Sequence, residues 1–129
     1  MKSKYAVIPM ILCWFCMSMH AQRAERVTTC EYLKNALDYA LIDSREDNTA
    51  YIDLVFRPGT KERSGDFSIA RTKFILSYLK FRSPQFDRIL VTHRNALSSL
   101  GSLELVVKGE KKGLMFFRKN TTRWNSCVE

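Results

Sequence analysis

The segment from Gly65 to Lys80 constrains the fold of this chain more than any other stretch. Its apolar residues recur at spacings of three and four, which is the pattern of a helix that buries one face; they are Phe67, Ala70, Phe74, Ile75, Tyr78 and Leu79. Asp66 can accept hydrogen bonds from the first free backbone N–H groups of such a helix, and its charge suits the positive end of the helix dipole. Because strand-like runs lie on both sides, we expect this helix to pack on a β-sheet.

A second amphipathic helix is predicted near the start, from Cys30 to Ile42, and the pattern Thr28 to Glu31 has the form of a capping box that fixes its beginning. Four runs rich in β-forming residues are predicted to be strands: Tyr51–Phe56, Arg88–His93, Leu103–Val107 and Leu114–Phe117. The segment Gly109–Gly113 is predicted to be the turn of a C-terminal hairpin. The predicted fold class is therefore α+β, with two helices packed on a small mixed sheet.

The first 21 residues have the pattern of a secretory signal peptide. Two lysines lie among the first four residues, an uncharged apolar run follows from Tyr5 to Met19, and Ala21 offers a small residue for cleavage. An uncleaved membrane anchor is the alternative, although the run is short for a span and contains Pro9. We expect cleavage after Ala21, which would leave residues 22–129 as one secreted or periplasmic domain.

Cleavage would leave two cysteines, Cys30 and Cys127, near the two ends of the remaining chain. An even pair in an exported protein predicts a disulfide, and closing a loop of this length is worth about 4–5 kcal/mol in the chain-entropy model. A metal site would need more ligands, since His93 is the only histidine beyond the leader. We expect no metal and no cofactor.

The chain lacks the sequence patterns of a hydrolase elbow or a phosphate-binding glycine loop. His93 stands at the end of a predicted strand without an evident nucleophile, and Ser98 and Ser99 lie in a loop of ordinary composition. Asp53 and Asp66 would form a carboxylate pair only if the fold brought them together. We therefore predict that the protein is not an enzyme.

Lysine and arginine outnumber aspartate and glutamate by 21 to 13, and losing the two leader lysines would change the net charge from +8 to +6. A basic surface attracts anionic polymers and lipids. Export disfavours nucleic acid as the partner, which leaves acidic groups of the cell wall and lipopolysaccharide. A charge excess of this size is also a common solubility feature, and that alternative stays open.

The predicted loop from Arg57 to Gly65 is the first candidate for a binding site. It holds Arg57, Lys61, Glu62 and Arg63 between the first predicted strand and the central helix. Loops at the carboxyl end of a strand in an α/β sheet are common ligand sites. A solvent-exposed charged loop without a ligand is the alternative.

The pattern Phe67-Ser68-x-x-Arg71-x-x-x-Ile75-x-x-Tyr78-Leu79 resembles the Leu-Ser-x-x-Arg-Ala-x-x-Val-x-x-Tyr-Leu helix of OmpA-like peptidoglycan-associated domains. The similarity continues at Arg88-Ile89, where that family has Arg-Ile at the start of the next strand, and at Leu103-Glu104-Leu105 in its final strand. In that family the helix arginine contacts the diaminopimelate carboxylate of peptidoglycan, a bidentate pairing. The resemblance implies this role for Arg71.

The chain departs from the family pattern where the strand before the helix ends. The family has Gly-His-Thr-Asp there, and its aspartate meets the ammonium group of the ligand; here Val55 to Gly59 contains no acid. Arg71 could instead serve as a structural ion-pair residue with Asp53 or Asp66.

These observations predict an exported, non-catalytic OmpA-like module that associates with the cell envelope, binding peptidoglycan or an envelope partner protein. The candidate ligand-binding residues are Arg57, Arg63 and Arg71. The alternative is a small secreted or periplasmic inhibitor or immunity-type protein that binds another protein.

Overall fold

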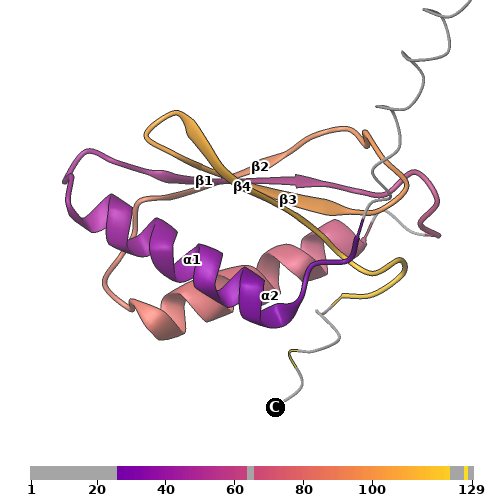
Figure 1. Ribbon diagram of the computed structural model, residues 1–129, viewed down its shortest axis with the longest axis horizontal. Helices are drawn as coiled ribbons and strands as arrows, with labels where there is room; N and C mark the ends of the chain where they lie inside the picture. Colours follow the sequence, from indigo (N-terminus) through magenta and orange to yellow (C-terminus); the bar gives the residue numbers. More distant parts are fainter. Residues whose placement is uncertain (1–25, 64–65, 123–126, 128–129) are drawn as a thin grey trace, which may run out of the picture.

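The computed structural model describes residues 26–63, 66–122 and 127. Along the chain it contains α1 (Cys30–Arg45), β1 (Ile52–Arg57), α2 (Phe67–Arg82), β2 (Ile89–His93), β3 (Ser102–Val107) and β4 (Glu110–Phe116). Both helices lie on the same face of the sheet (Figure 1), which confirms the predicted α+β arrangement. The predicted leader, residues 1–21, lies outside the described residues. Within the described residues, neither helix is long and apolar enough to cross a bilayer.

The four strands form one mixed sheet in the order β2-β1-β3-β4. β1 and β2 are parallel and joined through α2, whereas β3 runs antiparallel to both β1 and β4. The carboxyl ends of β1 and β2 therefore lie at the same end of the sheet, beside the start of β3. The loops that follow β1 and β2 are brought together there.

The predicted hairpin turn at Gly109–Gly113 is wrong in extent. The turn consists of Lys108 and Gly109 alone, with φ values of 54° and 75°, and Glu110 already belongs to β4. A two-residue turn with both φ values positive matches the twist of the flanking strands, so the strands can pair up to the turn.

The core lies between the sheet and the two helices. Alternate residues of β1 and β3 face the helices, because successive side chains of a strand point to opposite faces; those buried are Ile52, Leu54, Phe56, Leu103, Leu105 and Val107. α1 adds Leu33, Leu37, Ala40 and Leu41, and the C-terminal strand region adds Met115 and Phe117. The strands were predicted from their β-forming residues, and each of the four predicted runs overlaps a strand.

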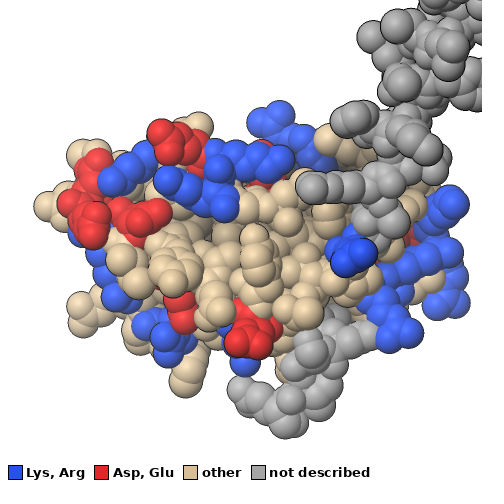
Figure 2. Space-filling model, in the orientation of Figure 1, with Lys and Arg blue, Asp and Glu red and all other residues tan. Residues whose placement is uncertain are grey.

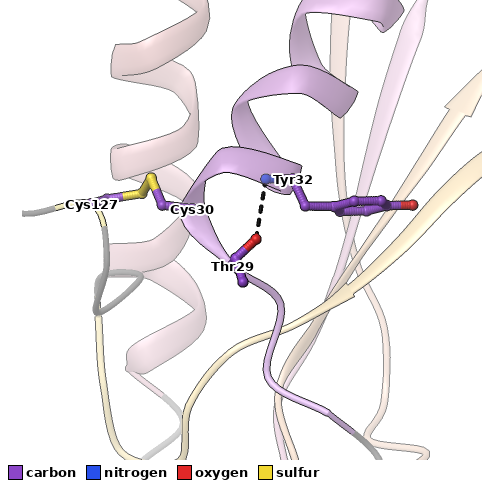
Figure 3. The surroundings of a disulfide bond; sticks show 4 residues. All are labelled: Thr29, Cys30, Tyr32 and Cys127. Carbon is purple, nitrogen blue, oxygen red and sulfur yellow. Dashed lines mark hydrogen bonds between the residues drawn. A yellow bond between two sulfur atoms is a disulfide. The ribbon is translucent and has the colours of Figure 1, made fainter.

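The start of α1 is fixed by Thr29, one residue later than the predicted capping box. The Tyr32 N–H donates to the Thr29 hydroxyl at 3.3 Å (Figure 3). Thr28 instead bonds to the end of β4: its N–H donates to the Phe116 carbonyl at 2.9 Å, and its hydroxyl accepts from the Phe116 N–H at 2.9 Å. Thr28 thus anchors the entrance of α1 to the sheet.

Cys30 and Cys127 form the predicted disulfide, with their Cα atoms 5.2 Å apart (Figure 3). The bond ties the first residue of α1 to the C-terminal segment across a sequence separation of 97 residues. A crosslink that closes a loop of this length lowers the conformational entropy of the unfolded chain. In the chain-entropy model this raises the free energy of unfolding by about 4–5 kcal/mol.

Candidate functional site

The buried face of α2 is rotated from the predicted one. The buried residues are Ser68, Arg71, Thr72, Ile75 and Leu79. Of the predicted apolar residues, Ile75 and Leu79 are thus buried as expected, whereas Phe67, Ala70, Phe74 and Tyr78 are half-buried. The Asp66 side chain makes no capping hydrogen bond to the helix, so that expectation is also wrong. The physical reason for the rotation is Arg71, which can occupy the core face because a buried acid balances its charge.

That acid is Glu62, in the loop after β1. Both side chains are only 1% exposed, and they pair in the bidentate manner: Nη1 lies 2.6 Å from Oε1 and Nη2 lies 2.5 Å from Oε2. The sequence offered a structural ion pair as the alternative role for Arg71. The pair is present, but the acid is Glu62 in place of Asp53 or Asp66.

The remaining donors and the face of the Arg71 guanidinium also have partners. Nε donates to the Thr121 carbonyl at 2.9 Å, and the guanidinium carbon lies 4.5 Å from the centroid of the Phe117 ring. A guanidinium over an aromatic face gains a cation–π interaction. Arg71 thereby ties α2 to the segment that follows β4.

Glu62 accepts two further hydrogen bonds, from the Gly59 N–H at 2.8 Å and from the Asn120 N–H at 3.2 Å. Burial acts to raise the pKa of Glu62, but the hydrogen bonds from Arg71 and Gly59, together with the Arg71 charge, outweigh burial and lower the pKa. Glu62 is therefore ionised at neutral pH and holds three segments of the chain together.

Two glycines make room for this pair. A Cβ atom on Gly101 would lie 2.1 Å from Nη1 of Arg71, and one on Gly59 would lie 2.4 Å from the Ser99 carbonyl oxygen. The backbone of the loop between β2 and β3 packs directly over the pair. Any side chain at Gly101 would displace the guanidinium.

Of the other two predicted site residues, Arg63 lies in the same loop as Glu62, whereas Arg57, predicted to begin that loop, is the last residue of β1. Arg57 is half-buried and donates through Nη1 to the Asn95 carbonyl at 2.9 Å. Arg63 is exposed, and its backbone N–H donates to Oδ1 of Asn120 at 2.9 Å. The fold thus brings the three predicted arginines to one end of the sheet, and of the three only Arg71 is fully buried.

Further basic residues from other segments reach this end, which we call the basic end; it consists of Arg57, Lys61, Arg63, Arg94, Arg118 and Lys119. Arg94 is placed there because its N–H donates to the Phe56 carbonyl at 2.9 Å. Figure 2 shows Lys and Arg side chains gathered at the right, over the loops that leave β1 and β2 in Figure 1. The exposed acid Asp66 also lies at this end.

Three residues of the basic end were not predicted from the sequence: Arg94, Arg118 and Lys119. Arg94 could have been grouped with Arg57, because the carboxyl ends of parallel strands meet at one edge of a sheet. Arg118 and Lys119 could not, because their position depends on the bonds from Arg71 and Arg63 to the segment after β4.

A second polar site lies between the two helices, in a groove of about 480 Å³. Its central acid is Asp38, which accepts hydrogen bonds from Arg82 Nε at 3.0 Å, from Arg82 Nη2 at 3.1 Å and from the Tyr78 hydroxyl at 3.0 Å. Burial, and then the hydrogen bond to Asp38, raises the pKa of Tyr78. The ion pair in this groove, Arg82 with Asp38, resembles the pair of Arg71 with Glu62 on the same helix, but it is exposed to solvent.

The other residues considered as catalytic candidates lie apart. Asp53, near the start of β1, accepts a hydrogen bond from the Thr92 hydroxyl at 2.9 Å, whereas Asp66 lies beyond the opposite end of that strand. His93 stacks on Phe56, with ring centroids 5.7 Å apart. Among the described residues, no group of three or more His, Cys, Asp or Glu side chains is placed to hold a metal ion.

The four-stranded mixed sheet has the fold class that the OmpA-like resemblance implies, but a fold class alone serves many functions. The resemblance itself stays a prediction. No family model, curated protein or solved structure matches this chain.

Proposed function

We propose that this protein is an exported, non-catalytic module that associates with the cell envelope by binding an anionic component at its basic end. The observation that carries the proposal is the convergence of six Lys and Arg residues from three segments, while Glu62 is turned inward and neutralised by Arg71. Basic groups held close together raise the local positive potential and attract carboxylates and phosphates.

The buried ion pair of Arg71 and Glu62 holds the segments that carry these basic residues in place. Glu62 is bonded to Arg71, Gly59 and Asn120, so the loop that carries Lys61 and Arg63 is held against the segment that carries Lys119. Positioned charges lose less conformational freedom when they bind than mobile ones. The pair therefore supports binding without touching the ligand.

The proposal assigns to Arg71 a different role from the one that the family resemblance implies. The guanidinium that would meet a diaminopimelate carboxylate is already bonded to Glu62 and to the Thr121 carbonyl. Ligand contact falls instead to the exposed side chains, chiefly Arg63, Arg94 and Lys119.

Co-sedimentation tests the proposal. The chain, expressed with its own leader in a host that exports it, is mixed with peptidoglycan sacculi or, separately, with vesicles containing anionic lipid. Wild type should pellet with at least one of them at low salt and be released as salt rises, because screening weakens exposed charge contacts. The two arms distinguish wall carboxylates from lipid phosphates.

Two variants localise the binding. Arg63→Glu with Lys119→Glu reverses two charges at the basic end and should abolish pelleting. Lys111→Glu with Lys112→Glu makes the same charge change on exposed residues near the start of β4, at the opposite end of the sheet, and should leave pelleting largely intact. Failure of wild type to pellet in both arms, or equal loss in both variants, would reject the proposal.

One observation favours the second candidate, an inhibitor or immunity-type protein. α1 exposes Tyr32, Tyr39 and Ile42, which lie along one side of the helix at spacings of seven and three. Exposed aromatic residues are enriched in protein interfaces. A stoichiometric protein complex that survives high salt and is lost in Tyr39→Ala would support this candidate over envelope binding.

A further inference from the structure

We propose that two copies of this chain associate through β2, in an antiparallel two-fold pairing that continues the sheet from one copy into the other. β2 is an outer strand of the sheet, and among the described strands it pairs with β1 alone. The free side of such a strand presents unpaired backbone groups, which are a template for another strand. The inference does not rest on the proposed function.

The two edges of the sheet differ in how far they are protected. β4 begins with Glu110, Lys111 and Lys112, its pairing with β3 contains an irregularity of register, and Thr28 bonds to its far end at Phe116. Charges and irregularities of this kind discourage edge pairing. β2 reads Ile-Leu-Val-Thr-His and contains neither a proline nor a Lys, Glu or Asp.

The backbone of β2 is oriented for an added strand. The Ile52 N–H donates to the Arg88 carbonyl at 3.0 Å, and the Arg94 N–H donates to the Phe56 carbonyl at 2.9 Å. Backbone groups alternate in direction along a strand, so the even-numbered residues of β2 turn toward β1. Val91 therefore turns its N–H and carbonyl outward, toward the position of a further strand.

β2 has exposed apolar side chains on both faces of the sheet. This favours a partner strand that pairs with its edge over a partner that packs on one face. Leu90 lies opposite Asp53 on the sheet face away from the helices, and Val91 lies opposite Leu54 on the helix side. They are 51% and 38% exposed. A strand added at the edge would cover both at once.

The charges around β2 favour a second copy in the antiparallel direction. Asp87 precedes the strand, and His93 and Arg94 end it; all three are exposed. Antiparallel pairing sets the acidic start of one β2 against the basic end of the other, whereas parallel pairing would place like ends together. The Arg88 guanidinium does not oppose this, because it folds back and donates to the Ala50 carbonyl at 2.8 Å.

The same charges select a register. With Leu90 opposite Leu90 of the second copy, Asp87 meets His93 and lies next to Arg94, and the two-fold axis keeps the helices of both copies on one face. Shifting the register so that Val91 meets Val91 would instead place Asp87 opposite Asn95 and so would separate it from His93.

Sedimentation velocity over a range of concentrations tests the dimer, using the chain expressed with its own leader and purified in its oxidised form. A five-residue edge strand gives a small interface, so we expect a dimer whose fraction rises between ~1 µM and ~1 mM. Leu90→Lys places two lysines opposite each other and should leave only monomer. Leu114→Lys, the same change at a 39% exposed leucine of β4, should sediment as wild type.

A cysteine at the axis tests the register. Cys30 and Cys127 are already bonded to each other, and the expected cleavage after Ala21 would remove Cys13 and Cys16. Leu90→Cys in the cleaved chain would then introduce a single free thiol that should form a disulfide-linked dimer on mild oxidation. Leu114→Cys should not. Wild type that stays monomeric, a dimer unaffected by Leu90→Lys, or cross-linking through Leu114→Cys alone would overturn the proposal. Monomeric wild type that binds another protein through Leu90 would assign this edge to a different partner and overturn it too.

Discussion

α2 carries two arginine–carboxylate pairs of the same chemistry in opposite surroundings. Arg71 and Glu62 are each 1% exposed, whereas Arg82 and Asp38 are 49% and 29% exposed. Both arginines bond their acid through two nitrogens. The comparison shows that burial, more than pairing geometry, decides what an ion pair does for a fold: water can replace either partner at the surface, but nothing replaces one in the core.

The buried pair also connects more segments of the chain than the exposed pair does. Arg71 and Glu62 join the loop after β1, the helix α2 and the segment after β4. Asp38 joins only the two helices, through Tyr78 and Arg82. We therefore expect perturbations of the buried pair to reach the basic end, and perturbations of the exposed pair to stay local.

The largest expected effect is that of Arg71→Ala, which leaves the Glu62 carboxylate buried without its counter-charge. We expect the free energy of unfolding to fall by about 3–5 kcal/mol, measured by urea denaturation. Arg71→Met combined with Glu62→Gln should cost less than the sum of the two single changes, because it removes both charges. If Arg71→Ala lowered the free energy of unfolding no more than Arg82→Ala does, the expected difference between the two sites would be contradicted.

Gly101→Ala should perturb the same pair by crowding. Its Cβ would lie 2.1 Å from Nη1 of Arg71, so either the guanidinium or the loop must move, at a cost of about 1–3 kcal/mol. Gly113→Ala is the matched control, because the nearest atom to its Cβ would be the Met115 methyl group at 3.9 Å. Thermal unfolding of the two variants measures the difference; equal melting temperatures would contradict the crowding at Gly101.

The acid dependence of stability should report on Glu62. Its pKa is lower in the folded protein than its usual value of 4.5, so the unfolded chain takes up the proton first as the pH falls. The stabilisation is therefore present above about pH 4.5 and is lost progressively below it. Urea midpoints across this range should fall less steeply for Glu62→Gln than for wild type, and parallel curves would contradict a lowered pKa.

The smallest expected effect is that of Arg82→Ala. An exposed pair of this kind contributes little to the free energy of unfolding, and salt screens it further. The expected change in the urea midpoint is small at low salt and vanishes at high salt. A loss comparable to that of Arg71→Ala would mean that the groove between the helices has a structural role beyond this ion pair.

Much of the fold could be predicted from the sequence because the relevant signals are local. The spacing of Leu33, Leu37 and Leu41 marks the buried side of α1, and the alternation in β1 and β3 marks their buried faces. The disulfide could be predicted because Cys30 and Cys127 are the two cysteines that lie beyond the predicted leader. The face of α2 was misjudged because its apolar periodicity competes with a buried arginine, and periodicity carries no information about a counter-charge.

The candidate site was only partly accessible from the sequence. Arg57 and Arg63 are close in the sequence and could be grouped by inspection. The partner of Arg71 could not be predicted, because Glu62 reaches it only when Gly101 and Thr121 pack around the pair. Sequence spacing fixes the local conformation of a helix or strand. Tertiary structure decides which charges meet and which strand edge stays open, because those outcomes depend on contacts between residues far apart in the chain.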